Sequence, residues 1–251
     1  MVASYPFDDS AQHYQQGHVS AAPDDAVFKH LAHIYANNHA FMKRGNICQG
    51  DNFKDGITNG AQWYDVPGGM EDFNYLHSNC FEITMELSCC KYPKRSELPG
   101  EWNNNREAML RFMEASHMGV KGRVRDESGS PVELASVHVS GIDHNVTTTE
   151  AGEYWRLLTP GTYSITVSAL GYQDTTEDSV VVTNNGGEAE VHDFTLVKRE
   201  SPAAGGEVEA GMQDTLTLTS PAPDTQTLSP EGFLTSPEFD YHHYDDLQVT
   251  T

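Results

Sequence analysis

The chain has 251 residues, enough for one large domain or two small ones. Its 15 Lys and Arg stand against 37 Asp and Glu, a formal net charge of -22, which argues against nucleic acid and anionic membrane surfaces as partners because both select basic patches. No apolar run reaches the roughly 18 residues that a membrane-spanning helix needs. The acidic balance fits either plain solubility or cationic partners.

Residues 1–118 have the pattern of a mixed α/β region. The opening sequence MVASYPF predicts a strand that lacks the basic start of a signal peptide, which is the first indication of a fragment. A helix is expected to begin at Asp24 and Asp25, whose acidic side chains suit the positive end of the helix dipole. The Gly-, Asn- and Asp-rich stretch 45–60 is expected to be a loop.

A strand is expected next, over residues 80–88. Its sequence alternates apolar residues with Glu and Thr, the period of a strand that buries one face. A final helix is expected from about Glu101 to His117, with Trp102, Met109 and Met113 on one side.

Residues 119–198 change character. Short segments such as VKGRVRD, ASVHVSG and TYSITVSA alternate with turn signals at a spacing typical of a β-sandwich. Residues 199–235 are acidic and rich in Pro, Ser, Thr and Gly, so a disordered linker is expected there. Residues 236–251 regain aromatic side chains, as if a further domain began.

Glu86, near the end of the strand expected at 80–88, has two interpretations. It is either an exposed or paired carboxylate at a strand end, or a general base held at the edge of a cleft. The stretch before it favours the second interpretation, since Gly68 and Gly69 would let a neighbouring tyrosine move over such a cleft.

Long stretches of residues 1–199 resemble one known family. The sequences NGAQWYDVPGGM, DFNYLHSNCFEIT and ELSCCKYP are similar to zinc metallocarboxypeptidases of the carboxypeptidase E/N/M/D subfamily, and the D type fits best. Residues 119–198 resemble the transthyretin-like domain that follows the catalytic domain in this subfamily. The sequence EFDYHHYDDLQ resembles the start of another catalytic repeat.

The resemblance implies roles for four residues. Glu86 matches the general base that promotes attack of a zinc-bound water, and Tyr64 matches a mobile tyrosine that closes on the substrate. Asp8 matches an acidic residue of the pocket that receives a C-terminal Lys or Arg, where a buried cation needs a paired anion. Glu71 lies where relatives usually have glutamine, and it would add a second negative charge to that pocket.

The resemblance also implies a zinc cofactor whose ligands are absent here. In the family an HxxE pair and a later His precede the strand that matches VASYPF, so this chain is expected to be a fragment that begins after all three ligands. Its own histidines, His30 and His33 among them, do not recreate that ligand set.

For the cysteines the resemblance implies a disulfide between Cys48 and Cys89, with Cys90 left without its partner and Cys80 as a buried free thiol. A disulfide implies an oxidising, secretory compartment. Asn145 begins a glycosylation sequon, which would be used only in a secreted chain.

Three functions are therefore compared. The leading one is a zinc carboxypeptidase, in the longer parent, that removes C-terminal Lys or Arg from peptides and proteins in the secretory pathway. That parent is either secreted or tethered to a membrane by a segment elsewhere in its sequence. The second is a non-catalytic carboxypeptidase-like binding or adhesion module. In the third, the β-sandwich alone is the functional unit.

Overall fold

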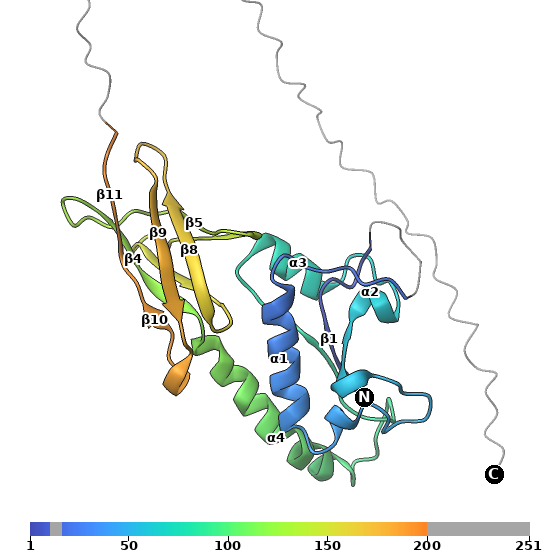
Figure 1. Ribbon diagram of the computed structural model, residues 1–251. Coiled ribbons are helices and arrows are strands. Elements are labelled where there is room, and N and C mark those ends of the chain that lie inside the picture. Colours follow the sequence, from blue (N-terminus) through green and yellow to red (C-terminus); the bar gives the residue numbers. More distant parts are fainter. Residues whose placement is uncertain (11–16, 200–251) are drawn as a thin grey trace, which may run out of the picture. The chain divides into compact units, whose positions relative to one another are not determined.

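The structure is a computed structural model that describes residues 1–10 and 17–199 (Figure 1). The expected linker, from residue 200 on, and the expected repeat at 236–251 lie outside the described residues. The described residues form helices and several separate sheets, so the chain is of mixed α/β character.

The described part of the first 118 residues, 1–10 and 17–118, contains four α-helices, three strands and three 3₁₀ turns. In chain order they are β1 (Val2–Tyr5), α1 (Asp25–Asn38), 3₁₀ turns at Met42–Arg44 and Lys54–Gly56, β2 (Ile57–Asn59), α2 (Gly60–Trp63), α3 (Met70–His77), β3 (Thr84–Glu86), α4 (Leu98–Glu114) and a 3₁₀ turn at Ala115–His117.

Strand β1 is the centre of a three-stranded sheet in the order β2-β1-β3. It pairs with β2 in parallel and with β3 antiparallel, so that Ser4 lies opposite both Thr58 and Thr84. All four residues of β1 are buried, which agrees with its apolar sequence.

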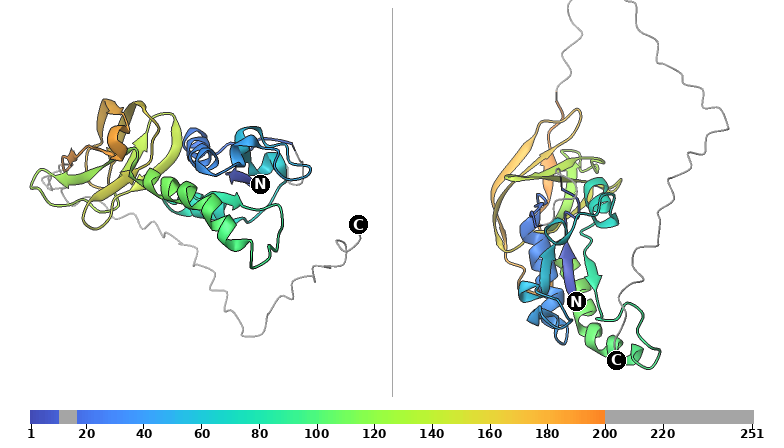
Figure 2. Two further views of the ribbon diagram at one scale, coloured as in Figure 1. Left: turned by 90° about the horizontal axis from the view of Figure 1, so that it is seen from below. Right: turned by 90° about the vertical axis from the view of Figure 1, so that its right-hand side faces the viewer.

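Helix α1 packs against β1 and α4, and the three elements contribute to one apolar core (Figures 1 and 2). The side chains that it buries recur at helical spacing, as the sequence predicted. They are Val27, Phe28, Leu31, Ala32, Tyr35 and Ala36.

The buried face of α4 does not include Trp102, Met109 or Met113. Trp102 and Met113 are 54% and 58% exposed, while Asn105 and Ala108 are buried. The reason is a hydrogen bond of 2.8 Å from the Tyr35 hydroxyl of α1 to the Asn105 side chain, which sets the polar Asn105 against α1. The apolar side predicted from the sequence therefore faces outward.

Two predicted boundaries were also wrong. The strand expected at 80–88 is only three residues long, Thr84–Glu86, because the strand beside it, β1, is itself short and pairs through three residues. The stretch 45–60, expected to be a loop, contains β2, whose strand conformation is stabilised by pairing with β1 rather than by its own sequence.

Residues 119–199 form two four-stranded sheets with a shared apolar core. In one sheet β4 pairs with β7, β10 and β11, and the other has the order β6-β5-β8-β9. Strand β6 was not predicted. The bounds are β4 (Val120–Asp126), β5 (Ser136–Val139), β6 (Ile142–Thr147), β7 (Glu153–Arg156), β8 (Gly161–Ser168), β9 (Thr175–Val182), a 3₁₀ turn at Asn185–Gly187, β10 (Glu190–Val191) and β11 (Phe194–Leu196).

Candidate functional site

A small cavity of about 40 Å³ lies beside the three-stranded sheet. Three of the four site residues predicted from the sequence line it, although they are far apart along the chain. The lining residues are Ser4, Asp8, Gly60, Trp63, Tyr64, Val66, Thr84 and Glu86.

The strand arrangement explains why these segments meet. Strands β1 and β2 are parallel, so the segments that follow them emerge at the same edge of the sheet. Asp8 follows β1, and α2 with Tyr64 just beyond it follows β2. Strand β3 pairs with the other side of β1 and carries Thr84 and Glu86 to the same place.

Asp8 is held by its backbone. Its N–H donates to both carboxylate oxygens of Asp72, at 2.9 and 3.1 Å, and the N–H of Asp9 donates to the same carboxylate at 3.0 Å. Gly60 lies so close that a Cβ atom there would come within 1.7 Å of Asp8 Oδ1. A side chain at position 60 would therefore displace the Asp8 carboxylate from this position.

Glu71 lies behind the cavity and is 2% exposed. Its Oε2 accepts a hydrogen bond of 2.8 Å from the Thr84 N–H. Burial and then the charge of Asp8 raise the pKa of Glu71 to about 9.

The pKa of Asp8 is also raised, to about 6, first by burial and also by the charge of Asp72, while a hydrogen bond with Glu71 lowers it. Asp8 and Glu71 are thus two carboxyl groups that share one site, where one proton between them avoids two adjacent buried charges. Such a pair would hold one negative charge near neutral pH, and an entering cation would favour ionisation of both groups.

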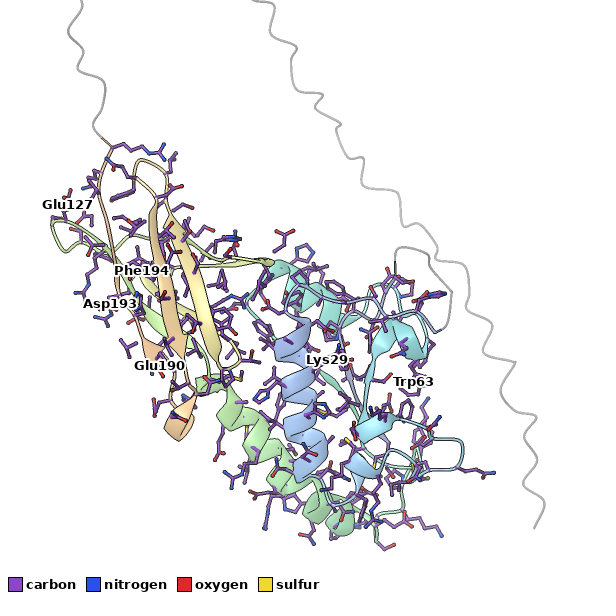
Figure 3. The ribbon with its side chains drawn as sticks, viewed as in Figure 1. Lys29, Trp63, Glu127, Glu190, Asp193 and Phe194 are labelled. Atoms are coloured by element: carbon purple, nitrogen blue, oxygen red, sulfur yellow. A yellow bond between two sulfur atoms is a disulfide. The ribbon has the colours of Figure 1, made fainter. Side chains whose placement is uncertain are left out.

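Tyr64 and Glu86 lie at the outer side of the cavity. The Tyr64 ring packs edge-on against Trp63, with ring centroids 4.8 Å apart, and Trp63 projects from α2 (Figure 3). The Tyr64 side chain is 41% exposed, and its pKa is raised by partial burial and by the charges of Glu86 and Asp8. Glu86, the last residue of β3, is exposed, which fits both interpretations of this carboxylate.

Two residues of this site were missed by sequence reasoning. Ser4 is 2% exposed and lines the cavity, yet no partner for its hydroxyl exists among the described residues. Asp72 fixes Asp8 through the backbone bonds above. Asp72 could have been predicted as a site residue, because it is next to Glu71 in the first turn of α3. Nothing in the sequence distinguishes Ser4, because a serine within a buried strand is common.

A larger cavity of about 630 Å³ lies on the outer side of α3, lined in part by Met70, Phe73 and Leu76. None of the four predicted site residues lines it. The candidate site is therefore the smaller cavity, which gathers the carboxylates and Tyr64.

Within residues 1–10 and 17–199, no group of three His, Cys, Asp or Glu side chains could hold a metal ion. That part of the chain therefore offers no ligand set for a resident zinc ion. No helix in the same ranges is long and apolar enough to cross a membrane.

The structure joins Cys48 and Cys89 in a disulfide, the pair that the resemblance implied. Cys90 is a free, exposed thiol. The expectation of a buried Cys80 was wrong: its thiol is free but exposed, because the segment before β3 leaves the sheet. Asn145 is exposed on β6, where its side chain lies 2.8 Å from Nδ1 of His138.

Comparison with known proteins gives two family matches. Residues 1–108 match the zinc carboxypeptidase family, and residues 119–197 match the carboxypeptidase regulatory-like domain. The chain is 47% identical to human carboxypeptidase D over 254 residues and 45% identical to the carboxypeptidase D of Drosophila melanogaster over 249 residues, in both cases across 99% of this chain. It is also 49% identical to the mouse carboxypeptidase N catalytic chain over 205 residues, or 80% of this chain.

The chain spans only 17% and 18% of the two carboxypeptidase D sequences, and 44% of the carboxypeptidase N chain. Both family matches nevertheless occur in one chain, and together they include every strand of the described structure. Residues 1–108 therefore belong to the zinc carboxypeptidase family, and a carboxypeptidase regulatory-like domain follows them at residues 119–197.

Proposed function

We propose that this chain is part of a longer zinc-dependent metallocarboxypeptidase that removes C-terminal Lys or Arg from peptides and proteins. The observation that carries the proposal is the convergence of Asp8, Tyr64 and Glu86 on one cavity, with the buried acid Glu71 directly behind Asp8. These residues lie on three separate segments, and a purely structural role would not require their side chains to share a cavity.

In this proposal Asp8 and Glu71 receive the cationic side chain of the substrate. A Lys or Arg side chain that enters the site meets two carboxyl groups, and its positive charge lowers the cost of ionising the second. The cavity of about 40 Å³ has room for the head of such a side chain but not for a peptide. The described residues then form one wall of a larger substrate site.

Glu86 would act as the general base. It is exposed at the end of β3, within reach of a water molecule in the cavity, and a carboxylate so placed accepts a proton from the attacking water. Tyr64 would cover the bound substrate, because it follows a short helix and keeps 41% of its surface exposed. Zinc, when bound, would supply Lewis-acid activation of that water.

The zinc ligands are proposed to lie in a part of the longer protein outside this chain, since the described residues offer no ligand set. The two sheets of residues 119–199 are proposed to form the transthyretin-like sandwich of this subfamily. The disulfide favours an oxidising compartment, so we place the protein in the secretory pathway or outside the cell, with Asn145 open to glycosylation.

The test compares this chain with a longer protein from the same gene. The longer protein should release arginine from a peptide ending in Arg and little from the same peptide ending in Leu. Its Glu86→Gln variant should lose release, while Asp8→Asn should lose the preference for Arg. The 251-residue chain alone should bind no stoichiometric zinc and release no arginine. Equal release of Arg and Leu would contradict the specificity, and full activity of Glu86→Gln would contradict the mechanism.

A non-catalytic binding module is the second candidate. Asp8 and Glu71 could hold a cationic side chain without any hydrolysis, because binding of a cation requires only the carboxyl pair. In that case the longer protein would bind peptides ending in Arg without hydrolysing them, and the Asp8→Asn variant would lose this binding.

A further inference from the structure

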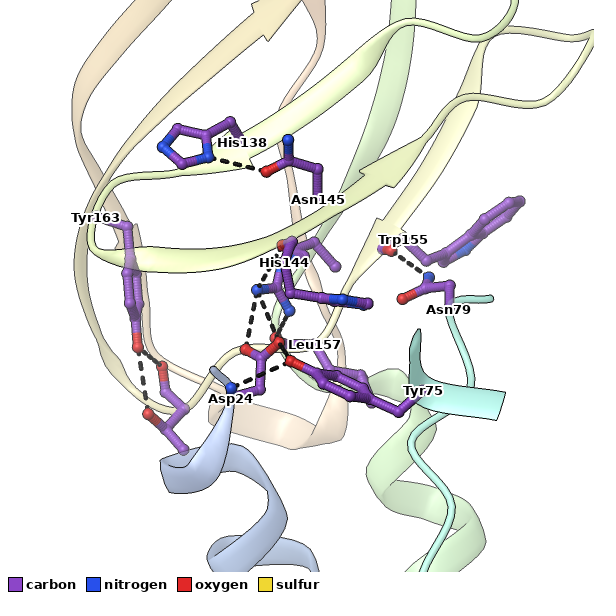
Figure 4. Close-up of polar contacts among 11 residues, drawn as sticks. Asp24, Tyr75, Asn79, His138, His144, Asn145, Trp155, Leu157 and Tyr163 are labelled. Atoms are coloured by element: carbon purple, nitrogen blue, oxygen red, sulfur yellow. Dashed lines mark hydrogen bonds and ion pairs between the residues drawn. The ribbon is translucent and has the colours of Figure 1, made fainter. Parts of the chain in front are cut away.

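The regulatory-like domain contacts the first portion of the chain through a buried ion pair at Asp24, in a cluster that includes Tyr75 and His144 (Figure 4). Arg156, on β7, is fully buried, and its Nη2 lies 2.9 and 3.1 Å from the two carboxylate oxygens of Asp24, whose side chain is also fully buried. Asp24 was expected to serve the positive end of α1, but its side chain makes no capping bond there. Its carboxylate is instead directed at the other domain.

Tyr75 of α3 completes this cluster. Its hydroxyl donates a hydrogen bond of 2.8 Å to Asp24 Oδ2 and accepts one of 3.2 Å from the Asp24 N–H. The Tyr75 ring, which is 0% exposed, stacks on His144 of β6 at a centroid distance of 4.1 Å. Arg156 also donates to the His144 carbonyl at 3.3 Å, so the same two elements of the sandwich hold both Asp24 and Tyr75.

A second contact holds the chain just beyond α3. The side-chain amide of Asn79 donates a hydrogen bond of 2.8 Å to the backbone carbonyl of Trp155, the residue before Arg156 on β7. Strand β7 therefore contacts the segment that follows α3 directly, through Asn79, and contacts α3 itself through Asp24 and Tyr75.

The opposite end of α3 belongs to the candidate site. Glu71 and Asp72, in its first turn, hold Thr84 and Asp8 through the bonds described above. Glu71 and Tyr75 are four residues apart, so they lie on the same face of this helix, about 6 Å apart along its axis. A helix of two turns is short and stiff, and a displacement at Tyr75 moves Glu71 with it.

We propose that Arg156 of the regulatory-like domain is a positioning residue for the cation-binding acids of the catalytic portion, acting through Asp24, Tyr75 and helix α3. This inference rests on the proposed function of Asp8 and Glu71. It assigns the second domain a part in substrate specificity, because loss of the buried cluster lets Glu71 and Asp72 withdraw from Asp8.

The first test uses a neutral change in the 251-residue chain. Tyr75→Phe removes only the hydroxyl that joins α3 to Asp24. Its matched control is Tyr154→Phe, since Tyr154 is equally buried and its hydroxyl donates to the His192 carbonyl within the sandwich. Carbon-13 NMR of the carboxyl groups gives the pKa of Glu71. In Tyr75→Phe that pKa should fall toward the ordinary glutamate range, a change of about tenfold or more in the proton dissociation constant. The control should not change it.

The second test uses the direction in which the pKa of Glu71 changes when Arg156 is replaced. Arg156→Gln removes a positive charge, and charge loss alone would raise the pKa of nearby carboxyl groups. Release of α3 has the opposite effect, because it exposes Glu71 and separates it from Asp8. A fall in the pKa of Glu71 thus identifies positioning, while Arg123→Gln, which removes the exposed Arg123–Glu153 pair, should leave it unchanged.

Hydrogen exchange of the Asp8 amide, which donates to Asp72, provides a readout independent of the Glu71 titration. It should quicken in Tyr75→Phe and not in Tyr154→Phe. The positioning role would be overturned if the Asp8 amide exchanged at an unchanged rate and the pKa of Glu71 stayed the same or rose in both Tyr75→Phe and Arg156→Gln. Equal changes in the controls, Tyr154→Phe and Arg123→Gln, would also overturn it. A Glu71 that titrates in the ordinary range in the unaltered chain would instead count against the acid pair of the proposed function, with the exchange result still deciding the role of Arg156.

Discussion

The acid pair predicts an unusual dependence of stability on pH. Glu71 has a pKa of 4.5 as an ordinary glutamate and about 9 in the folded chain. Because the pKa is raised in the folded state, Glu71 keeps its proton between pH 4.5 and about 9 when the chain is folded, whereas the unfolded chain has lost it. The free energy of unfolding contributed by this group is therefore complete below pH 4.5 and is lost as the pH rises toward 9.

The change that isolates this contribution is Glu71→Gln, which keeps the size of the side chain and removes the titration. From pH 7 to pH 8.5 the unaltered chain should lose about 2 kcal/mol of unfolding free energy through Glu71, at about 1.4 kcal/mol per pH unit with a reduced slope near pH 9. Asp8, with a pKa of about 6, is already ionised over this range. The Glu71→Gln variant should therefore lose about 2 kcal/mol less unfolding free energy than the unaltered chain over the same pH range.

The assay is urea unfolding followed by tryptophan fluorescence at the two pH values. Glu133→Gln is the control, because Glu133 is an exposed glutamate in the segment between β4 and β5. Other titrating groups are common to all three proteins and cancel in the comparison. Equal losses of stability in the unaltered chain and in Glu71→Gln would refute the reasoning, since Glu71 would then not hold a proton in the folded state.

Three further changes test the fold around the site. Replacing Cys48 and Cys89 by Ser opens a loop with a sequence separation of 41, which should cost about 4 kcal/mol in urea unfolding, and an unchanged midpoint would contradict a closed disulfide. Asp24→Ala leaves a buried cation without its partner and should cost about 3–5 kcal/mol of unfolding free energy; a cost below about 1 kcal/mol would show an exposed pair. Gly60→Ala should destabilise the chain by about 1–3 kcal/mol through collision with the nearby aspartate. Gly100→Ala, where a Cβ meets nothing within 4 Å, should be neutral or stabilising by up to about 1 kcal/mol in the same assay, and equal effects of the two changes would contradict the crowding at position 60.

Much of the local structure was predictable because it depends on patterns within short segments. The buried strand at the N-terminus, helix α1 and most strands after residue 119 follow from apolar periodicity and turn residues. The residues Asp8, Tyr64, Glu71 and Glu86 were selected by resemblance to a family, and periodicity alone left Glu86 with two interpretations. Their convergence on one cavity could not be read from spacing, because it depends on the order of the strands in the sheet.

What the sequence determined by itself was the type of most elements, the acidic character of the chain and the family to which it belongs. Only the tertiary structure decided that Asp24 pairs with Arg156 across 132 positions, that α4 turns its Trp102 outward and that Cys80 is exposed. The physical reason is that periodicity reports which side chains share a face, whereas burial depends on what packs against that face. For a polar residue such as Asp24 the partner comes from a distant part of the chain, and no local pattern specifies it.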